Sequence, residues 1–255
     1  MLSEQELERY ARQLVLRQWS PETQERLKLA SAIIVGAGAL GSPVALYLTA
    51  AGIGQIGIVD DDNVELSNLH RQLLHFTPDL GLAKADNAVV KLRALNPETH
   101  VEPYPVRLDA ANGQAIVAGA DVVVDCSDCF ESRCAVNAAC CAEGVDLVEA
   151  GVLGLSGLVM TIRPGVSACY SCAFPKRPTD PDDGAREQGV LGPVAGIIGS
   201  IQALEALKLL GGVGEPLLDR ILMLEAADMT QTLVATQRRP DCSACAGVPA
   251  AAQSS

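Results

Sequence analysis

The sequence predicts an α/β protein whose mostly parallel, doubly wound β-sheet carries an antiparallel extension, and three observations support this. Short β-branched segments alternate with helical segments over the first 150 residues, as in parallel strands joined by crossover helices. A glycine turn, GAGALG at 36–41, runs from the first such strand straight into a helix, which is typical of Rossmann-like folds. The later segments SGLVMTIRP and RILMLEAADMTQTLVATQ lack the helical spacers of the first half, which predicts antiparallel strands.

Hydrophobic periodicity and turn residues assign the individual elements in chain order. The predicted helices are 4–18, 21–30, 40–51, 80–95 and 131–143, and the predicted strands after SAIIV are 55–60, 100–106, 121–126 and 146–151. The segment Gly189–Leu210 is long and apolar enough to resemble a membrane span. Pro193 fits a helix start, however, and Gln202, Glu205 and Lys208 would have to lie in lipid, so we predict a buried core helix.

Composition fits one domain over residues 1–255, with a mobile loop at about 175–189 that is rich in Pro, Asp and Gly, and a flexible tail at 246–255. The net charge of −12 disfavours nucleic acid and anionic membrane surfaces as partners. The charged N-terminal segment has no apolar signal core, which favours a cytoplasmic, reducing location. There, nine cysteines are expected to be thiols or metal ligands.

The glycine turn is the first candidate ligand site. Gly36, Gly38 and Gly41 follow a strand and begin a helix, and Asp60 ends the next strand. Glycines at this place let backbone N–H groups approach a phosphate, and the carboxylate can accept a hydrogen bond from a ribose hydroxyl. The sequence therefore predicts nucleotide binding, although a turn needed only for packing would contain the same glycines.

The segment after the second strand adds charged and amide side chains near this turn. DDDNVELSNLHRQ contains Asp62, Asn68, Arg71 and Gln72, and Lys84 follows in GLAKAD. Cations beside carboxylates suit a triphosphate with its Mg²⁺ better than a nicotinamide cofactor. The alternative is a solvated loop with surface ion pairs.

Two cysteine pairs indicate a metal site. CYSC at 169–172 and CSAC at 242–245 have the spacing of two zinc knuckles, and their ligands would be Cys169, Cys172, Cys242 and Cys245. A redox centre needs only one such pair, and a disulfide is unusual in a reducing compartment. We therefore predict a closed structural Zn²⁺ site.

Several of these motifs together resemble a known family. GAGALGS, VDDDNVELSNLHRQ, GLAKAD, DCSD with Arg133 after it, and GPVAGIIGSIQALEALK stand in the order and spacing of the HesA/MoeB/ThiF family. This family comprises ubiquitin-activating-like adenylyltransferases that serve sulfur-carrier proteins. The similarity extends from RYARQLVL to CSAC and implies the fold of ubiquitin-activating enzymes.

The resemblance also implies roles for particular residues. The glycine turn would line the ATP phosphates, and Asp60 would lie near the ribose. Asn68, Arg71 and Lys84 would hold the triphosphate and stabilise charge as the α-phosphate is attacked. Asp128 matches a magnesium-linked aspartate, and the family carries a structural zinc at the cysteine pairs.

Partners are implied in the same way. Arg12 matches an arginine that reaches the partner subunit's site in relatives, which implies a homodimer. The substrate would be a small ubiquitin-like sulfur carrier ending in Gly-Gly, whose terminal carboxylate attacks ATP to give an acyl-adenylate and pyrophosphate for later thiocarboxylate formation. We expect a separate sulfur donor, such as a cysteine desulfurase or a rhodanese, in a molybdopterin or thiamine-thiazole type of pathway.

Two positions depart from the family's pattern. Cys129 stands where relatives usually have Asn, which could alter the nucleotide pocket. Ala185 occupies the place where relatives commonly have a cysteine that can join the carrier, so no covalent conjugate is expected there.

Two other classes of function share part of the pattern. An NAD-dependent oxidoreductase would need the glycines and Asp60 but not Arg71, Lys84 and Asp128, and a non-catalytic carrier-binding scaffold could lose those three residues. Binding of ATP or of NADH separates the first alternative from an adenylyltransferase.

Overall fold

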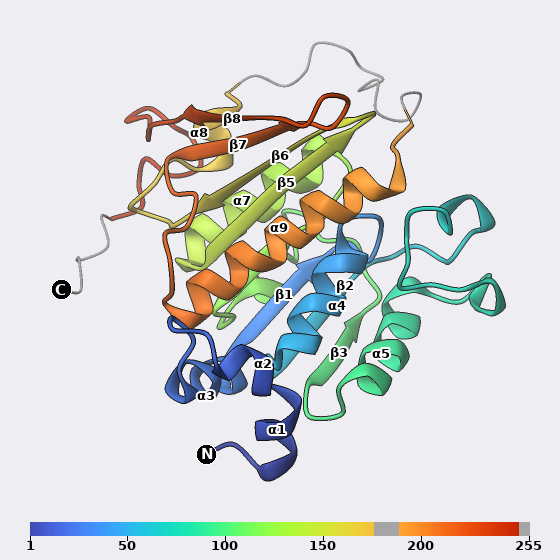
Figure 1. The fold of residues 1–255 in the computed structure, drawn as a ribbon. Coiled ribbons are helices and arrows are strands. Elements are labelled where there is room, and N and C mark those ends of the chain that lie inside the picture. Colours follow the sequence, from blue (N-terminus) through green and yellow to red (C-terminus); the bar gives the residue numbers. More distant parts are fainter. Residues whose placement is uncertain (176–188, 250–255) are drawn as a thin grey trace.

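The computed structural model describes residues 1–175 and 189–249, whose strands form one sheet in the order β3-β2-β1-β4-β5-β6-β7-β8 (Figure 1). The five strands from β3 to β5 are parallel, and β6, β7 and β8 add to the β5 edge in antiparallel register. This confirms the predicted mostly parallel sheet with its antiparallel extension. The strands are β1 Ser31–Val35, β2 Gln55–Val59, β3 His100–Tyr104, β4 Val122–Asp125, β5 Asp146–Leu153, β6 Ser156–Ile162, β7 Arg220–Glu225 and β8 Thr230–Ala235.

Helices cover both faces of the sheet because alternate residues of each parallel strand point to opposite faces. In β1, Ile34 packs into the core beneath α4 and α9, whereas Ile33 and Val35 pack into a second core beneath α6 and α7. Figure 1 shows α4, α5 and α9 in front of the sheet. The first face carries α3 Pro21–Leu29, α4 Gly41–Ala51, α5 Lys84–Leu95 and α9 Gly192–Gly211, and the second carries α6 Gly113–Val117, α7 Phe130–Glu143 and α8 Tyr170–Ala173.

Two predicted helices are wrong in their extent. The segment 4–18 forms two short helices, α1 Glu4–Arg9 and α2 Ala11–Leu14, that meet at Tyr10. Tyr10 is buried and its hydroxyl accepts a hydrogen bond from Asn96, a tertiary contact that periodicity cannot predict. The helix expected at 80–95 begins only at Lys84, because Gly81 adopts a left-handed φ of +84°.

Helix α9 contains the apolar segment that resembles a membrane span, and it packs within the fold against β4, β5 and β6. Its polar side chains have partners there. Gln202 donates to the carbonyl of Asp125 at 2.8 Å, and Glu205 accepts from the Thr161 hydroxyl at 2.6 Å. These buried contacts place α9 in the protein core, as the sequence predicts.

Helix α9 also offers a matched test of this packing. A Cβ at Gly199 would lie 2.5 Å from Pro43 Cγ and 2.7 Å from Leu40 O, whereas a Cβ at Gly196 would meet no atom within 4 Å. We therefore expect Gly199→Ala to lower the free energy of unfolding by about 1–3 kcal/mol. Gly196→Ala should instead raise it by up to about 1 kcal/mol because alanine favours helix. Equal denaturation midpoints for the two variants would show that α9 does not lie against α4 in this way.

Candidate active site

The candidate site lies where the chain changes direction between β1 and β4. These strands are neighbours, yet β1 leads through α4 to β2 on one side and β4 leads through α7 to β5 on the other. Such a switch point leaves a crevice at the carboxyl ends of the strands. Gly36 follows β1 with φ of +98°, and a Cβ on it would lie 2.7 Å from the carbonyl oxygen of Cys126, which follows β4. Only glycine suits this conformation and this approach.

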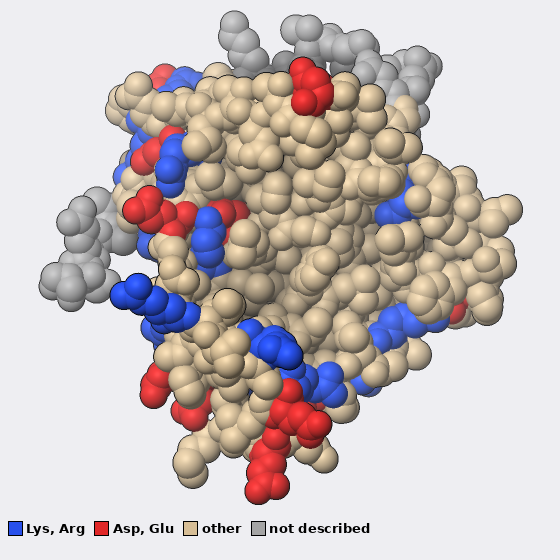
Figure 2. Space-filling view, in the orientation of Figure 1, with Lys and Arg blue, Asp and Glu red and all other residues tan. Residues whose placement is uncertain are grey.

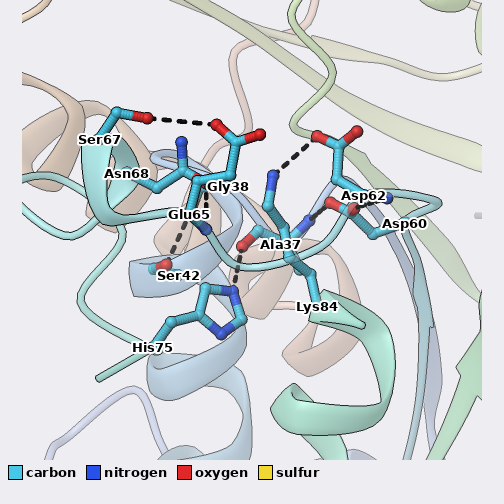
Figure 3. Close-up of polar contacts among 10 residues, drawn as sticks. All are labelled: Ala37, Gly38, Ser42, Asp60, Asp62, Glu65, Ser67, Asn68, His75 and Lys84. Carbon is cyan, nitrogen blue, oxygen red and sulfur yellow. Dashed lines mark hydrogen bonds and ion pairs between the residues drawn. The ribbon is translucent and has the colours of Figure 1, made fainter. Parts of the chain in front are cut away.

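The glycine turn is held by the carboxylate that ends the next strand. Asp60 accepts a hydrogen bond from the Ala37 N–H at 2.7 Å with one oxygen and from the Asp62 N–H at 2.9 Å with the other (Figure 3). Burial of Asp60 raises its pKa above the usual value. Gly41 is required for close packing, because a Cβ there would overlap the carbonyl of Gly36. Asp60 thus supports the turn that the sequence predicts to bind phosphate.

The segment between β2 and α5 brings the predicted cation Lys84 back to the turn. The Lys84 N–H donates to the Asp62 carbonyl at 2.9 Å, and its ammonium lies 2.8 Å from the Asp62 carboxylate. The Lys84 side chain is 6% exposed, whereas that of its partner Asp62 is 68% exposed. A buried lysine therefore meets a carboxylate that lies at the protein surface. Asn68 is buried, and its side-chain oxygen accepts from the Glu65 N–H.

Arg71 and Gln72 follow Asn68 in the same segment, and Gln72 lies beside the glycine turn. Arg71 donates to the Ser67 carbonyl at 3.0 Å, and its guanidinium lies 2.8 Å from His70 Nε2. The Gln72 side-chain nitrogen lies 3.5 Å from the position that a Cβ on Gly38 would take, and its buried Oε1 has no hydrogen-bond partner within the described part of the chain. An unpartnered buried oxygen beside an open glycine backbone suits a site that a polar ligand completes.

Asp128 and Arg133 line a pocket on the other side of the crevice. The pocket holds ≈ 270 Å³ and is bounded by the end of β5, the start of β6, Tyr170 and Met223. Asp128 is exposed at this pocket, two residues after the Cys126 carbonyl that touches the glycine turn. Arg133 donates to the Ser127 carbonyl at 3.2 Å and approaches Glu149 at 3.3 Å. The loop that follows β4 therefore contacts the glycine turn at Cys126 and reaches this pocket at Asp128.

A buried acid pair holds Arg133 in place. Asp125 and Glu149 lie side by side in the register of β4 and β5, and both are fully buried. Burial, and then the Asp125 charge, raise the pKa of Glu149 well above its usual value. Arg133 is the cation that faces these two carboxyl groups. The sequence does not predict this pair, since strand register alone brings the two residues together.

Arg12 is not brought to the glycine turn of its own chain. Arg12 is exposed on α2, two residues after Tyr10. The Tyr10 hydroxyl accepts a hydrogen bond from Asn96, which lies at the end of α5. Lys84 begins the same helix, and 12 residues of α-helix span about 18 Å. Arg12 therefore lies near the far end of α5 from the other predicted site residues.

Cys129 has polar neighbours that sequence analysis did not predict. Its Sγ accepts a hydrogen bond from Arg107 at 3.2 Å and lies 3.1 Å from the Ser132 hydroxyl, at the start of α7. The side chain therefore faces Arg107. Ala185, and the loop predicted at 175–189 except for its two ends, lie outside the described residues, as do residues 250–255 of the predicted tail.

The four knuckle cysteines converge, as their spacing predicts. Their Sγ atoms all lie within 4.8 Å of one another and are buried, with the pairs Cys169–Cys242 and Cys172–Cys245 at 3.6 and 3.5 Å. Four sulfurs around one Zn²⁺ stand about 3.8 Å apart, so this cluster could hold zinc. The Arg239 N–H donates to Cys172 Sγ, a contact that favours a thiolate.

Comparison with known proteins identifies the family. The family model described as ThiF matches residues 10–244. This chain belongs to the ThiF family. Two similar relatives are the "Sulfur carrier protein adenylyltransferase" of Thermus thermophilus and the "SAMP-activating enzyme E1" of Haloferax volcanii. Each is 44% identical to this chain. The match with the first covers 97% of this chain and 93% of the relative, and the match with the second covers 94% of this chain and 89% of the relative.

Longer relatives and solved structures agree with this ThiF-family assignment. The "Adenylyltransferase and sulfurtransferase MOCS3" of Sus scrofa is 42% identical over 97% of this chain, which spans about half (55%) of that protein. A crystal structure of E. coli MccB with ATP matches this chain with a TM-score of 0.83 and 25% sequence identity. The match covers 93% of this chain and 74% of the MccB chain. Adenylyltransferases take AMP from ATP, so the family implies that this ThiF-family enzyme uses ATP.

Metal analysis tests the cysteine cluster. We expect about one tightly bound zinc per chain in protein purified without added metal, because four buried thiolates suit Zn²⁺ and metal binding adds to the free energy of folding. Cys169→Ser and Cys242→Ser should each lose zinc and lower the thermal midpoint. Cys129→Ser, outside the cluster, should keep its zinc. A wild-type protein without metal would contradict the assignment.

Proposed function

We propose that this chain catalyses the ATP-dependent adenylation of the C-terminal glycine of a small ubiquitin-like sulfur carrier, giving an acyl-adenylate and pyrophosphate. The observation that carries the proposal is the glycine turn, which Asp60 connects to Asp62 and its partner Lys84, and which lies against the start of the loop that leads to Asp128. Relatives that match almost the whole chain are named as enzymes of this kind.

The residues around the turn fit ATP. The Gly38 N–H has no acceptor within the described residues and could donate to a phosphate oxygen, whereas the adjacent buried Gln72 oxygen can only accept and would need a hydroxyl or amino group of the nucleotide. Asp60 stands beside the turn, where a ribose hydroxyl would donate to it. The exposed carboxylate of Asp128 suits a Mg²⁺ ion that would neutralise phosphate charge.

The reaction requires charge neutralisation and alignment rather than a proton acceptor. The carrier's carboxylate is already ionised at neutral pH, and its oxygen forms a bond to the α-phosphorus as the bond to pyrophosphate breaks. Lys84 and Arg71 would stabilise the negative charge that develops on the phosphate oxygens. Lys84 is paired with the exposed Asp62, so ATP would replace a solvated partner rather than a buried one.

The pocket beside Asp128 suits the approach of the carrier's tail. Gly151 and Gly157 form part of its wall. A Gly-Gly terminus of the carrier has no side chains, so it can enter a narrow pocket. A separate persulfide donor, such as a cysteine desulfurase or a rhodanese, would then displace AMP in a molybdopterin or thiamine type of pathway. We place the enzyme in the cytoplasm, which suits nine cysteines that form no disulfide within the described chain.

We further propose a homodimer in which Arg12 completes the partner's site. Arg12 is exposed and distant from the crevice of its own chain. The face in front of α4 and α9 has few charges near its centre (Figure 2) and includes exposed Tyr47, Ile197 and Leu204. A weakly charged surface with large apolar side chains is typical of subunit interfaces.

Removal of the cations tests the proposed chemistry. Arg71→Ala and Lys84→Ala should each lower carrier-dependent ATP–pyrophosphate exchange about 100-fold or more, because stabilisation of phosphate charge is lost. Asp128→Ala should lower it similarly. Arg93→Ala, a cation elsewhere on α5, should retain exchange. Exchange at the wild-type rate in the first two variants would refute their roles.

Mixing two inactive variants tests the shared site. Arg12→Ala and Asp128→Ala should each be inactive as homodimers. Random mixed dimers have one site with both residues, so refolding the two together should restore about a quarter of the wild-type exchange rate. If Arg12 acts within its own chain, the mixture will stay inactive.

A further inference from the structure

Ala37, between Gly36 and Gly38, has both of its backbone polar groups bonded to side chains. Its N–H donates to Asp60 at 2.7 Å, and its carbonyl lies 3.0 Å from Nε2 of the buried His75. Figure 3 shows His75 beneath the turn, pointing at Ala37, and Asp60 on the other side. His75 comes from the segment after the short 3₁₀ helix η1 Leu66–Asn68, so its contact with Ala37 is a tertiary one. The proposed ATP chemistry uses the turn but does not use His75.

The hydrogen bonds fix the protonation of the His75 ring. A carbonyl oxygen can only accept, so Nε2 must carry the hydrogen that Ala37 receives. On the other side of the ring, Asn87 Nδ2 lies 2.8 Å from Nδ1. The amide nitrogen of Asn87 can only donate, so it requires an acceptor at this position. Nδ1 is therefore the acceptor, and the ring is the neutral Nε2–H tautomer.

The contact sets the direction of the next amide. In a trans peptide, the Gly38 N–H points opposite to the Ala37 C=O. Since His75 holds that carbonyl on the buried side, the Gly38 N–H faces away from the core. Within the described residues this N–H meets no acceptor. A rotation of the peptide would turn the donor away from the crevice and leave a buried carbonyl without a partner, at a cost in free energy.

We propose that His75 is a positioning residue for nucleotide binding, whose neutral imidazole orients the Ala37–Gly38 peptide so that the Gly38 amide is presented to a phosphate oxygen. The inference rests on the proposed function for the identity of the ligand, ATP, but not for the reaction that follows. Asn87 fixes the ring, and the ring fixes the turn.

Burial is the main factor that keeps the His75 ring neutral. Burial lowers its pKa below the usual value, and the Lys84 ammonium lowers it further, against the opposing effects of the Ala37 carbonyl, Asp60 and Asp79. A lowered pKa means that the folded protein resists protonation as the pH falls through the ordinary histidine pKa of about 6.5. The unfolded chain takes up that proton first, so the contribution of this site to stability is complete above pH 6.5 and falls below it.

Substitutions of matched shape test the role. Glutamine can place an N–H near the position of Nε2, whereas asparagine is too short and leucine has no donor. We expect His75→Asn and His75→Leu to raise the Kd for ATP with Mg²⁺ about tenfold, the equivalent of one buried hydrogen bond, while His75→Gln retains affinity. Thr99→Val is the control, because it removes a buried 2.8 Å donor to the Ile53 carbonyl away from the turn. It should leave the Kd unchanged at a similar cost in thermal midpoint.

Nitrogen-15 NMR of the histidine rings tests the tautomer directly in the ligand-free wild type, with the His75 signals assigned from His75→Gln. The signals should show the neutral Nε2–H form at pH 7, and the ring should take up its proton at a lower pH than an exposed histidine does. A charged ring or an Nδ1–H tautomer at pH 7 would overturn the proposal, as would an unchanged Kd in both His75→Asn and His75→Leu. The variants could show the expected shifts in Kd for ATP while the wild type shows no carrier-dependent exchange. That result would refute the proposed reaction but support the role of His75.

Discussion

The candidate site depends on one close approach, that of Gly36 to the backbone carbonyl of Cys126. A single Cβ at this point would separate the turn after β1 from the loop after β4. Those loops carry the proposed phosphate-binding amides on one side and Asp128 on the other, so the approach determines whether a nucleotide can meet both. Asp60 and His75 then hold Ala37 from two sides, which makes the turn rigid before any ligand binds. Preorganised donors of this kind cost no reorganisation during the reaction.

Charges around the crevice are arranged according to their burial. Lys84 is buried but reaches the exposed Asp62, and Arg71 bonds a backbone carbonyl, so both cations can exchange their partners for phosphate oxygens. Arg133 differs, because it faces the fully buried pair Asp125 and Glu149. Separating Arg133 from these buried carboxyl groups would be costly. Arg133 is therefore suited to shaping the pocket rather than to moving with the substrate.

Sequence patterns predicted the fold class and most elements because strand periodicity, glycine turns and crossover order are local signals. They predicted the convergence of the four cysteines for the same reason, since knuckle spacing is a local pattern with a known geometry. The helix at 4–18 failed because the contact of Tyr10 with Asn96 is 86 residues apart in sequence. His75 was passed over because its partners, Ala37 and Asn87, are 38 and 12 residues away, and Glu149 because only strand register places it beside Asp125.

The central claim is that a carrier carboxylate attacks the α-phosphorus of ATP. The most direct measurement uses a Gly-Gly-ending carrier whose terminal carboxylate contains oxygen-18, incubated with the enzyme, ATP, Mg²⁺ and hydrosulfide. Attack on the α-phosphorus, followed by displacement of AMP by sulfur, predicts that mass spectrometry will find one carboxylate oxygen in AMP. Label in inorganic phosphate, with ADP as the nucleotide product, would show attack on the γ-phosphorus and contradict the account.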